Sequence, residues 1–299
     1  MTLSARPWFL LIITTFLTLT LAAQQQHDRE YWRAIARNHY AVPEHESADT
    51  LAHELSALLG SEDPELRDDL AYSILATWIH HDKLSPAAML VLTDEWRSNL
   101  KSGLGETGTL SVLKRSFSAL CLSEIAKREA KSEFLGPARY HSLLAEAISY
   151  LQAEQDLRGY DAKLHWIHAT AHTADLLAAL ADSALLTKEE AAAILQAIDT
   201  RLATAPQVYT QGEQDRVADA VVHVIRRKDF DTSTFEPWLS RLQDEDRDVW
   251  TATTPESLAR YQNHNYMLQA LAVRISFEPD SPSLLGAKQA VLKLLRSRE

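Results

Sequence analysis

The chain has 299 residues, of which 46% are hydrophobic and 24% charged, a balance typical of a globular protein with a large core. Its formal net charge of -11 argues against nucleic-acid binding, because phosphate backbones attract a basic surface. Only 8 glycines and 10 prolines are present, and alanine and leucine are abundant. We therefore expect few long linkers and a mainly helical chain.

Residues 1–23 have the pattern of a secretory signal peptide. Arg6 provides a basic start, an apolar run follows over 8–21, and the small residues Ala22 and Ala23 suit a cleavage site. The run is shorter than the roughly 20 apolar residues of a membrane span. We expect a secreted or periplasmic protein cleaved near Ala23, with a single all-helical domain over 27–299. An uncleaved signal segment, the only expected membrane contact, is the alternative.

Helices are predicted one after another along this domain. Ser47 or Asp49 can cap an early helix, Pro64 suits the first turn of the next, and Ser85-Pro86 begins another that reaches about residue 100. Further helices are predicted at about 109–130, 137–153, 160–182, 187–203, 211–227, 255–276 and 283–297, with a short helix around Trp238 inside 229–254. No alternating pattern of useful length indicates a strand.

This succession predicts an all-α fold, an irregular α-α superhelix of HEAT-like stacked helical pairs, with an α/α toroid as the alternative. The glycine-rich segment 101–110 is interpreted as a turn between helices. It is not a phosphate loop, because no strand precedes it and Lys114 does not complete the pattern. Cys121, the single cysteine, lies in an apolar helical stretch and is interpreted as a buried hydrophobic residue.

The stretch "HWIHATAHTADLL" is the strongest candidate for a site. On a helix over 160–182, His165, His168, His172 and Asp175 would share one stripe roughly 80° wide. Asp175 is the only charged residue between Leu164 and Ala181, so this helix should be largely buried. The imidazoles would then lie in the interior or line a groove, where their nitrogens need partners.

Three interpretations of this stretch stay open. His168 and His172 could hold a zinc ion, with Asp175 as a third ligand or as the group that orients the imidazole. A carboxylate beside a histidine could equally form a general base. In the third, the side chains form only a polar seam between helices. The glutamate of the zinc-protease motif is replaced by Ala169, so we expect no cofactor, with zinc as the alternative.

Other charged residues could complete a groove around the histidines. Each taken alone is typical of a helix cap or a surface ion pair. The candidates are Arg115, Glu213, Asp215 and Arg216.

Several segments together resemble a known family. The pieces "DPELRDDLAYSILATWI", "RSFSAL", "EQDLRGY", "WIHATAHTADLL" and "GEQDRVADAV" occur in an order similar to that of a bacterial family catalogued as domain of unknown function 2785. The resemblance covers nearly all of the chain after the signal peptide, and 166–177 is its most specific piece. The chain departs from the family pattern at Leu110, Leu113, His165, Gln214 and Asp215. The resemblance implies an all-helical fold and no assigned activity.

Two functions are therefore carried forward. The first is a binding module for an unknown protein or small ligand, with a groove lined by histidine and aspartate. The alternative is a hydrolase that uses His168, His172 and Asp175, with or without a metal ion. Ser116 and Ser118 are the nearest serines by motif, but neither lies in a nucleophile-elbow pattern. The binding module ranks first because no nucleophile or third metal ligand is identifiable.

Overall fold

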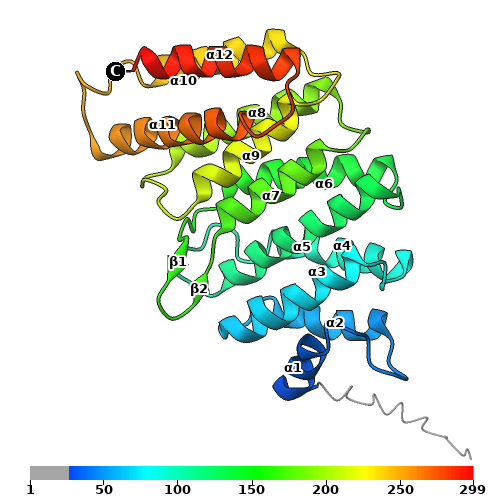
Figure 1. The fold of residues 1–299 in the computed structure, drawn as a ribbon. Coiled ribbons are helices and arrows are strands. Elements are labelled where there is room, and N and C mark those ends of the chain that lie inside the picture. The colour runs from blue at the N-terminus through cyan, green and yellow to red at the C-terminus, as the bar shows by residue number, and fades with distance from the viewer. Residues whose placement is uncertain (1–26, 299) are drawn as a thin grey trace, which may run out of the picture.

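The computed structural model describes residues 27–298, so the predicted signal peptide lies outside the described residues. Within them the protein is all-α, as predicted (Figure 1). The elements before the central hairpin are α1 (Arg29–Arg37), α2 (Ala48–Leu58), the π-helix η1 (Glu65–Tyr72), α3 (Ser73–His80), α4 (Pro86–Asn99), α5 (Ser111–Lys131) and α6 (Pro137–Ala153). Those from the hairpin onward are β1 (Tyr160–Asp161), β2 (His165–Trp166), α7 (Ala169–Ala181), α8 (Lys188–Thr204), α9 (Glu213–Ile225), the short 3-10 helix η2 (Thr232–Thr234), α10 (Phe235–Glu245), α11 (Pro255–Ile275) and α12 (Pro282–Arg296).

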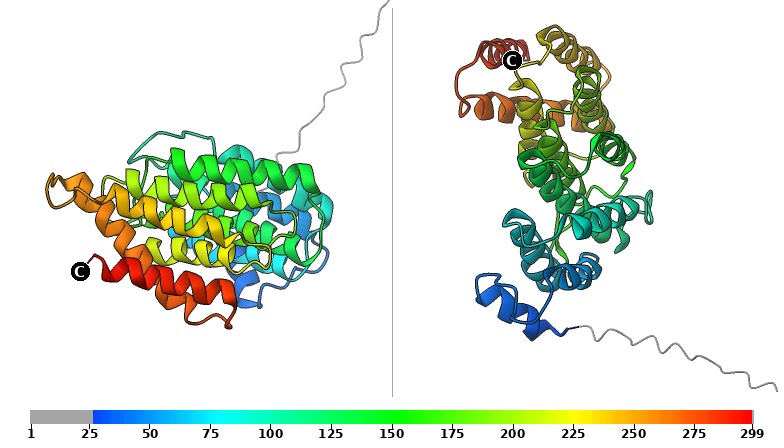
Figure 2. Two further views of the ribbon diagram at one scale, coloured as in Figure 1. Left: turned by 90° about the horizontal axis from the view of Figure 1, so that it is seen from above. Right: turned by 90° about the vertical axis from the view of Figure 1, so that its right-hand side faces the viewer.

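The helices stack along one long axis from α1 to α12 (Figure 1), and the right-hand view of Figure 2 shows them in two columns. In one column α5 packs on α7, α7 on α9, and α9 on α11. In the other, α6 packs on α8, and the columns join through α4 on α5, α6 on α7 and α8 on α11. Successive helices therefore bury each other's faces, while the finer expectation of a superhelix or a toroid stays a prediction.

Most helix starts follow the signals in the sequence. Ser85 accepts a hydrogen bond from the backbone of Ala88 and is followed by a first-turn proline. Pro137 and Pro255 open α6 and α11 where they were expected to. Thr187 and Glu190 form a reciprocal capping box at the start of α8. These local hydrogen bonds satisfy backbone groups that helix ends leave free.

The core is rich in tryptophan, and two of its indoles donate to backbone carbonyls. Trp78 donates to the Tyr40 carbonyl at 2.7 Å, and Trp238 donates to the Leu195 carbonyl at 2.9 Å. Cys121 is fully buried, and burial raises the pKa of its thiol, as expected for a small core residue rather than a nucleophile.

The prediction of one helix over 160–182 is wrong in its first part. Residues 160–166 form an antiparallel hairpin in which Tyr160 pairs with Trp166 and Asp161 with His165, and α7 begins only at Ala169. The hairpin projects beyond the helix ends at one edge of the stack (Figure 1). His165 and His168 have φ values of 57° and 51°, which an α-helix excludes.

Local hydrogen bonds favour the hairpin over a helix. Asp161 Oδ1 accepts from the backbone nitrogens of Lys163 and Leu164, which closes the turn. The Gly159 carbonyl accepts from the backbone nitrogens of Ile167 and His168.

Among the described residues, no helix combines the length and apolar character needed to cross a membrane.

Candidate functional site

A fully buried arginine of η1 is hydrogen bonded to the backbone of the hairpin. The Arg67 guanidinium donates to the carbonyls of Leu164 at 2.6 Å and Trp166 at 3.3 Å, and to that of Ser61 at 2.8 Å. Its Nε lies 2.7 Å from Asp68 Oδ1. Burial raises the pKa of Asp68 to about 6, against the opposing effect of Arg67. Arg67 was not among the groove candidates predicted from the sequence, because no local pattern shows that it reaches the backbone of Leu164 and Trp166.

His172 lies in α7 and faces Ser116 of α5. The Ser116 hydroxyl donates to the Ile167 carbonyl and lies 2.8 Å from His172 Nδ1. Since the hydroxyl proton is used on the carbonyl, the ring donates from Nδ1, and its Nε2 carries a free lone pair. Burial, assisted by the neighbouring His168, lowers the pKa of His172 to about 3. The imidazole is therefore neutral near pH 7.

His168 is the N-cap residue of α7. Its Nε2 lies 3.0 Å from the Gln211 carbonyl and 3.5 Å from Glu213 Oε1, so Nε2 carries the proton. Burial lowers the pKa of His168, and Glu213 opposes this effect. The ring stacks on Trp166 with centroids 4.7 Å apart and lies 5.8 Å from the His172 ring, nearly perpendicular to it. The two histidines are neighbours as expected, but only His172 is on the helix.

Glu213, the first residue of α9, is buried beside the hairpin. Its Oε2 accepts from the Gln211 backbone nitrogen at 2.8 Å, and Gln211 Oε1 accepts from the Tyr160 backbone nitrogen at the same distance. A Cβ at Gly159 would overlap both Gln211 Oε1 and Glu213 Oε1. The absence of a side chain at Gly159 therefore lets the hairpin approach α9 closely.

None of the remaining candidates is hydrogen bonded to either histidine, although the charges of Asp175 and Arg216 act on the pKa of His168. His165 is exposed on β2 and stacks on Tyr160 at 5.6 Å. Asp175 accepts two hydrogen bonds from Arg216 Nη1, at 2.9 and 2.8 Å, so its carboxylate is bound by Arg216 rather than by His172. Burial raises the pKa of Asp175, and Arg216 opposes the effect. Asp215 lines a hollow of about 460 Å³ between α9 and α11, together with Tyr209, Gln214 and Tyr266.

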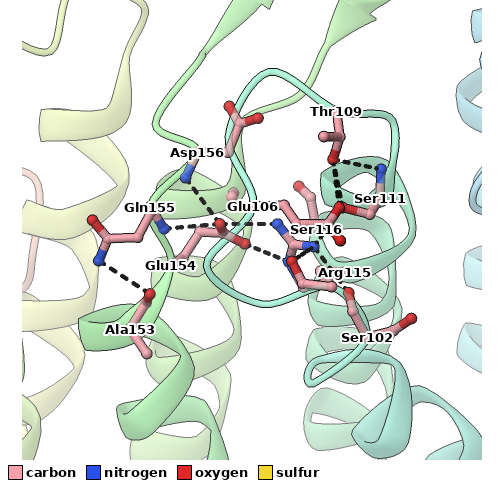
Figure 3. Close-up of polar contacts among 12 residues, drawn as sticks. Ser102, Glu106, Thr109, Ser111, Arg115, Ser116, Ala153, Glu154, Gln155 and Asp156 are labelled. Carbon is pink, nitrogen blue, oxygen red and sulfur yellow. Dashed lines mark hydrogen bonds and ion pairs between the residues drawn. The ribbon is translucent and has the colours of Figure 1, made fainter.

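Arg115 belongs to a separate, fully bonded network (Figure 3). Its Nε and Nη2 bind the two oxygens of Glu154 at 2.7 and 3.0 Å, and both side chains are buried. Its Nη1 donates to the carbonyls of Ser102 and Gly103 and to the Ser111 hydroxyl. Glu154 Oε1 also accepts from the backbone nitrogens of 155 and 156. Arg115 thus fixes the loop 101–110 against the chain that enters the hairpin.

Two aromatic side chains of the hairpin stay half exposed. Tyr160 is 44% exposed and Trp166 is 43% exposed, and their rings meet edge to face at 4.9 Å. Each also stacks on a histidine, Tyr160 on His165 and Trp166 on His168. Arg67 is hydrogen bonded to the backbone from which Trp166 projects. Sequence reasoning missed Tyr160 and Trp166, because large aromatic residues in a predicted buried helix are interpreted as core residues.

The comparisons with known proteins identify a family and give no activity. The family model whose description reads "Protein of unknown function (DUF2785)" matches residues 100–273. This stretch includes α5, the hairpin, α7 and α9, whereas the resembling segment at 63–79 lies outside it. No curated protein and no solved structure matches the chain. The matched stretch covers more than half of the 299 residues, and the chain therefore belongs to this family of unknown function.

Proposed function

We propose that the protein is a binding module that docks a partner protein on its hairpin surface, which we define as the side chains of Tyr160, His165 and Trp166. The observation that carries this proposal is the pair of half-exposed aromatic rings braced by histidines. Tyrosine and tryptophan are enriched among the residues that dominate protein–protein binding energy. Large apolar rings held half in water gain free energy when a partner covers them.

The shape of this surface favours a protein over a small ligand. Small-molecule sites are concave, whereas the hairpin projects beyond the helix ends (Figure 1). The rigidity of the surface also favours binding. Arg67 fixes the hairpin backbone and Gly159 allows it to lie against Glu213, so little conformational entropy is lost when a partner docks.

The alternative function, a hydrolase, has one observation in its favour, which is the 2.8 Å contact between Ser116 Oγ and His172 Nδ1. A serine activated by histidine needs its oxygen free to attack substrate. Here the hydroxyl is fully buried and donates to the Ile167 carbonyl. Catalysis would require the hairpin to lift away from α5, and the binding module needs no such movement.

Site-specific photo-crosslinking in the producing cells tests the proposal. A benzophenone amino acid replaces Tyr160 in one variant and Trp250 in a matched control, since Trp250 is 67% exposed and lies beyond α10. We expect one adduct of defined mass from position 160 and its loss when Trp166→Ala is added. The same adduct from position 250, or none from position 160, would exclude the hairpin surface as the docking site.

A second measurement separates the hydrolase. A fluorophosphonate probe labels activated serines, and we expect no label on Ser116 in the folded protein. Labelling that disappears in Ser116→Ala and His172→Ala, accompanied by ester hydrolysis lost in the same variants, would replace the binding module by the hydrolase.

A further inference from the structure

A second group of polar side chains lies far from the hairpin, where α8, α10 and α11 meet. Asp199 comes from α8, Glu245 is the last residue of α10, and His264 comes from α11. One oxygen or nitrogen atom of each lies within 4.8 Å of the others. Asp199 is 1% exposed and His264 is 0% exposed, while Glu245 is exposed and opens the group to solvent.

Two buried atoms of this group have no hydrogen-bond partner. They are Asp199 Oδ1 and His264 Nε2. Buried polar atoms are nearly always bonded, and each unpaired one costs free energy. The other oxygen of Asp199 has partners: Oδ2 contacts Gln196 Nε2 at 3.4 Å and Arg241 Nε at 3.5 Å.

The tautomer of His264 leaves its Nε2 as a hydrogen-bond acceptor. Its Nδ1 lies 2.9 Å from Asp246 Oδ2, and a carboxylate accepts, so Nδ1 carries the proton and Nε2 presents a lone pair. Nε2 and Asp199 Oδ1 are then two buried acceptors in one cluster, and neither can donate a hydrogen bond to the other. A carboxylate behind a histidine is the arrangement that orients the ring in metal sites and makes it a stronger ligand.

We propose that Asp199, Glu245 and His264 bind one zinc ion, with Asp246 as the residue that positions His264. Zinc accepts imidazole nitrogen and carboxylate oxygen at about 2.0–2.2 Å, so a small closing movement of the three helices brings the ligand atoms into range. Three protein ligands leave a fourth position for water. The ion would tie α8, α10 and α11 together.

The surrounding charges are compatible with a cation. Glu245 ends α10, where the helix dipole is negative and favours positive charge. Three arginines face the group: Arg298 and Arg260 bind Asp246 at 2.8 and 3.3 Å, and Arg241 approaches only Asp199 Oδ2. None of these contacts involves Asp199 Oδ1 or His264 Nε2, so the proposed ligand atoms stay free. Burial also raises the pKa of Asp199 to about 6, with Glu245 as the next contributor, because the carboxylate lacks full compensation.

Zinc titration of the chelator-treated full chain tests this site. Competition with a chromophoric chelator gives stoichiometry and affinity, and we expect one zinc per chain and a rise in Tm on loading. Glu245→Gln changes an exposed side chain and should leave the fold intact, and Asp199→Asn keeps the side-chain shape. Each should weaken zinc binding on the order of 100-fold, and Asp246→Asn by about 10- to 100-fold.

Two controls decide where the zinc is bound. Glu236→Gln alters another exposed glutamate of α10 and should bind zinc like the wild type. His168→Ala with His172→Ala should also bind normally, because the proposed site does not use them. Wild-type protein that binds no stoichiometric zinc would overturn the proposal. So would binding that survives Asp199→Asn and Glu245→Gln and disappears with the two histidines.

Discussion

Two buried polar regions of the molecule differ in how completely their polar atoms are hydrogen bonded. The first is the hairpin segment, residues 154–168, where Glu154, Arg67 and Ser116 direct their hydrogen bonds to defined protein groups. The second is the C-terminal cluster of Asp199, Glu245, Asp246 and His264, where two buried acceptors lack partners. The first region holds the chain in place, whereas the second is complete only with an added cation. The unpartnered Nε of Arg67 in the first region still lies 2.7 Å from Asp68 Oδ1, whereas Asp199 Oδ1 and His264 Nε2 in the second have no hydrogen-bond donor.

The largest loss of stability is expected when the buried ion pair of the hairpin region is broken. Glu154→Gln leaves the Arg115 charge buried without its ion partner, and we expect the free energy of unfolding to fall by about 3–5 kcal/mol. Urea denaturation measures this loss. Asp244→Asn removes the exposed partner of Arg247 and should cost at most about 1 kcal/mol. Equal losses in both variants would mean that the buried network is not special.

A pH titration tests the closed region through His172. The unfolded chain takes up a proton near pH 6.5, whereas the pKa of the folded residue is about 3, so acid favours unfolding. Stability is present above pH 6.5 and is lost as the pH falls toward 3, by about 2 kcal/mol between pH 6.5 and 5. Denaturation at several pH values should show this loss in the wild type and less of it in His172→Gln. Parallel curves for the two proteins would contradict burial of a neutral imidazole.

Two glycine substitutions compare close packing with open space. Gly159→Ala forces a methyl group against Gln211 and Glu213, and we expect a loss of about 1–3 kcal/mol. Gly286→Ala, inside α12 with nothing near the added methyl, should instead stabilise by up to about 1 kcal/mol. Thermal unfolding of both variants gives the two signs. A neutral Gly159→Ala would show that the hairpin is not held against α9.

The smallest change in stability is expected in the C-terminal cluster when no metal is bound. Asp199→Asn replaces an incompletely compensated buried carboxylate by an amide of the same shape, so in chelator its stability should stay within about 1 kcal/mol of the wild type. Denaturation with and without zinc separates the roles, because only the wild type should gain stability from the ion. A loss as large as that of Glu154→Gln would place Asp199 in a closed network.

Most helices could be predicted because their signals are local. Ser85, Pro137 and Pro255 each combine a cap or a first-turn proline with the apolar periodicity that follows. The all-α class follows from the same signals, and it is confirmed.

The hairpin could not be read from the sequence, because its strands have two residues each and its composition fits a helix equally well. The left-handed backbone of His165 and His168 belongs to a hairpin that has local hydrogen bonds from Asp161 and Gly159 and is held in addition by tertiary contacts with Arg67 and Gln211. The candidate site was therefore found in the right stretch but with the wrong backbone. The grouping of His168, His172 and Glu213, and that of Asp175 with Arg216, could be anticipated.

The C-terminal cluster gave almost no signal in the sequence. Asp199 and His264 lie among many other polar residues of α8 and α11, 65 positions apart, and only the fold brings them together.

The wide turns of η1 have a consequence for how much length variation this protein tolerates. Each backbone hydrogen bond of a π-helix encloses one more residue than that of an α-helix. η1 joins directly onto α3. Arg67 must reach the hairpin from one end, while Trp78 must reach the Tyr40 carbonyl at the other. Deleting a single residue between them would let the segment rewind as an α-helix and turn one of the two side chains away by about 100°. The residue count between Arg67 and Trp78 is thus as much a fixed part of the fold as the side chains themselves.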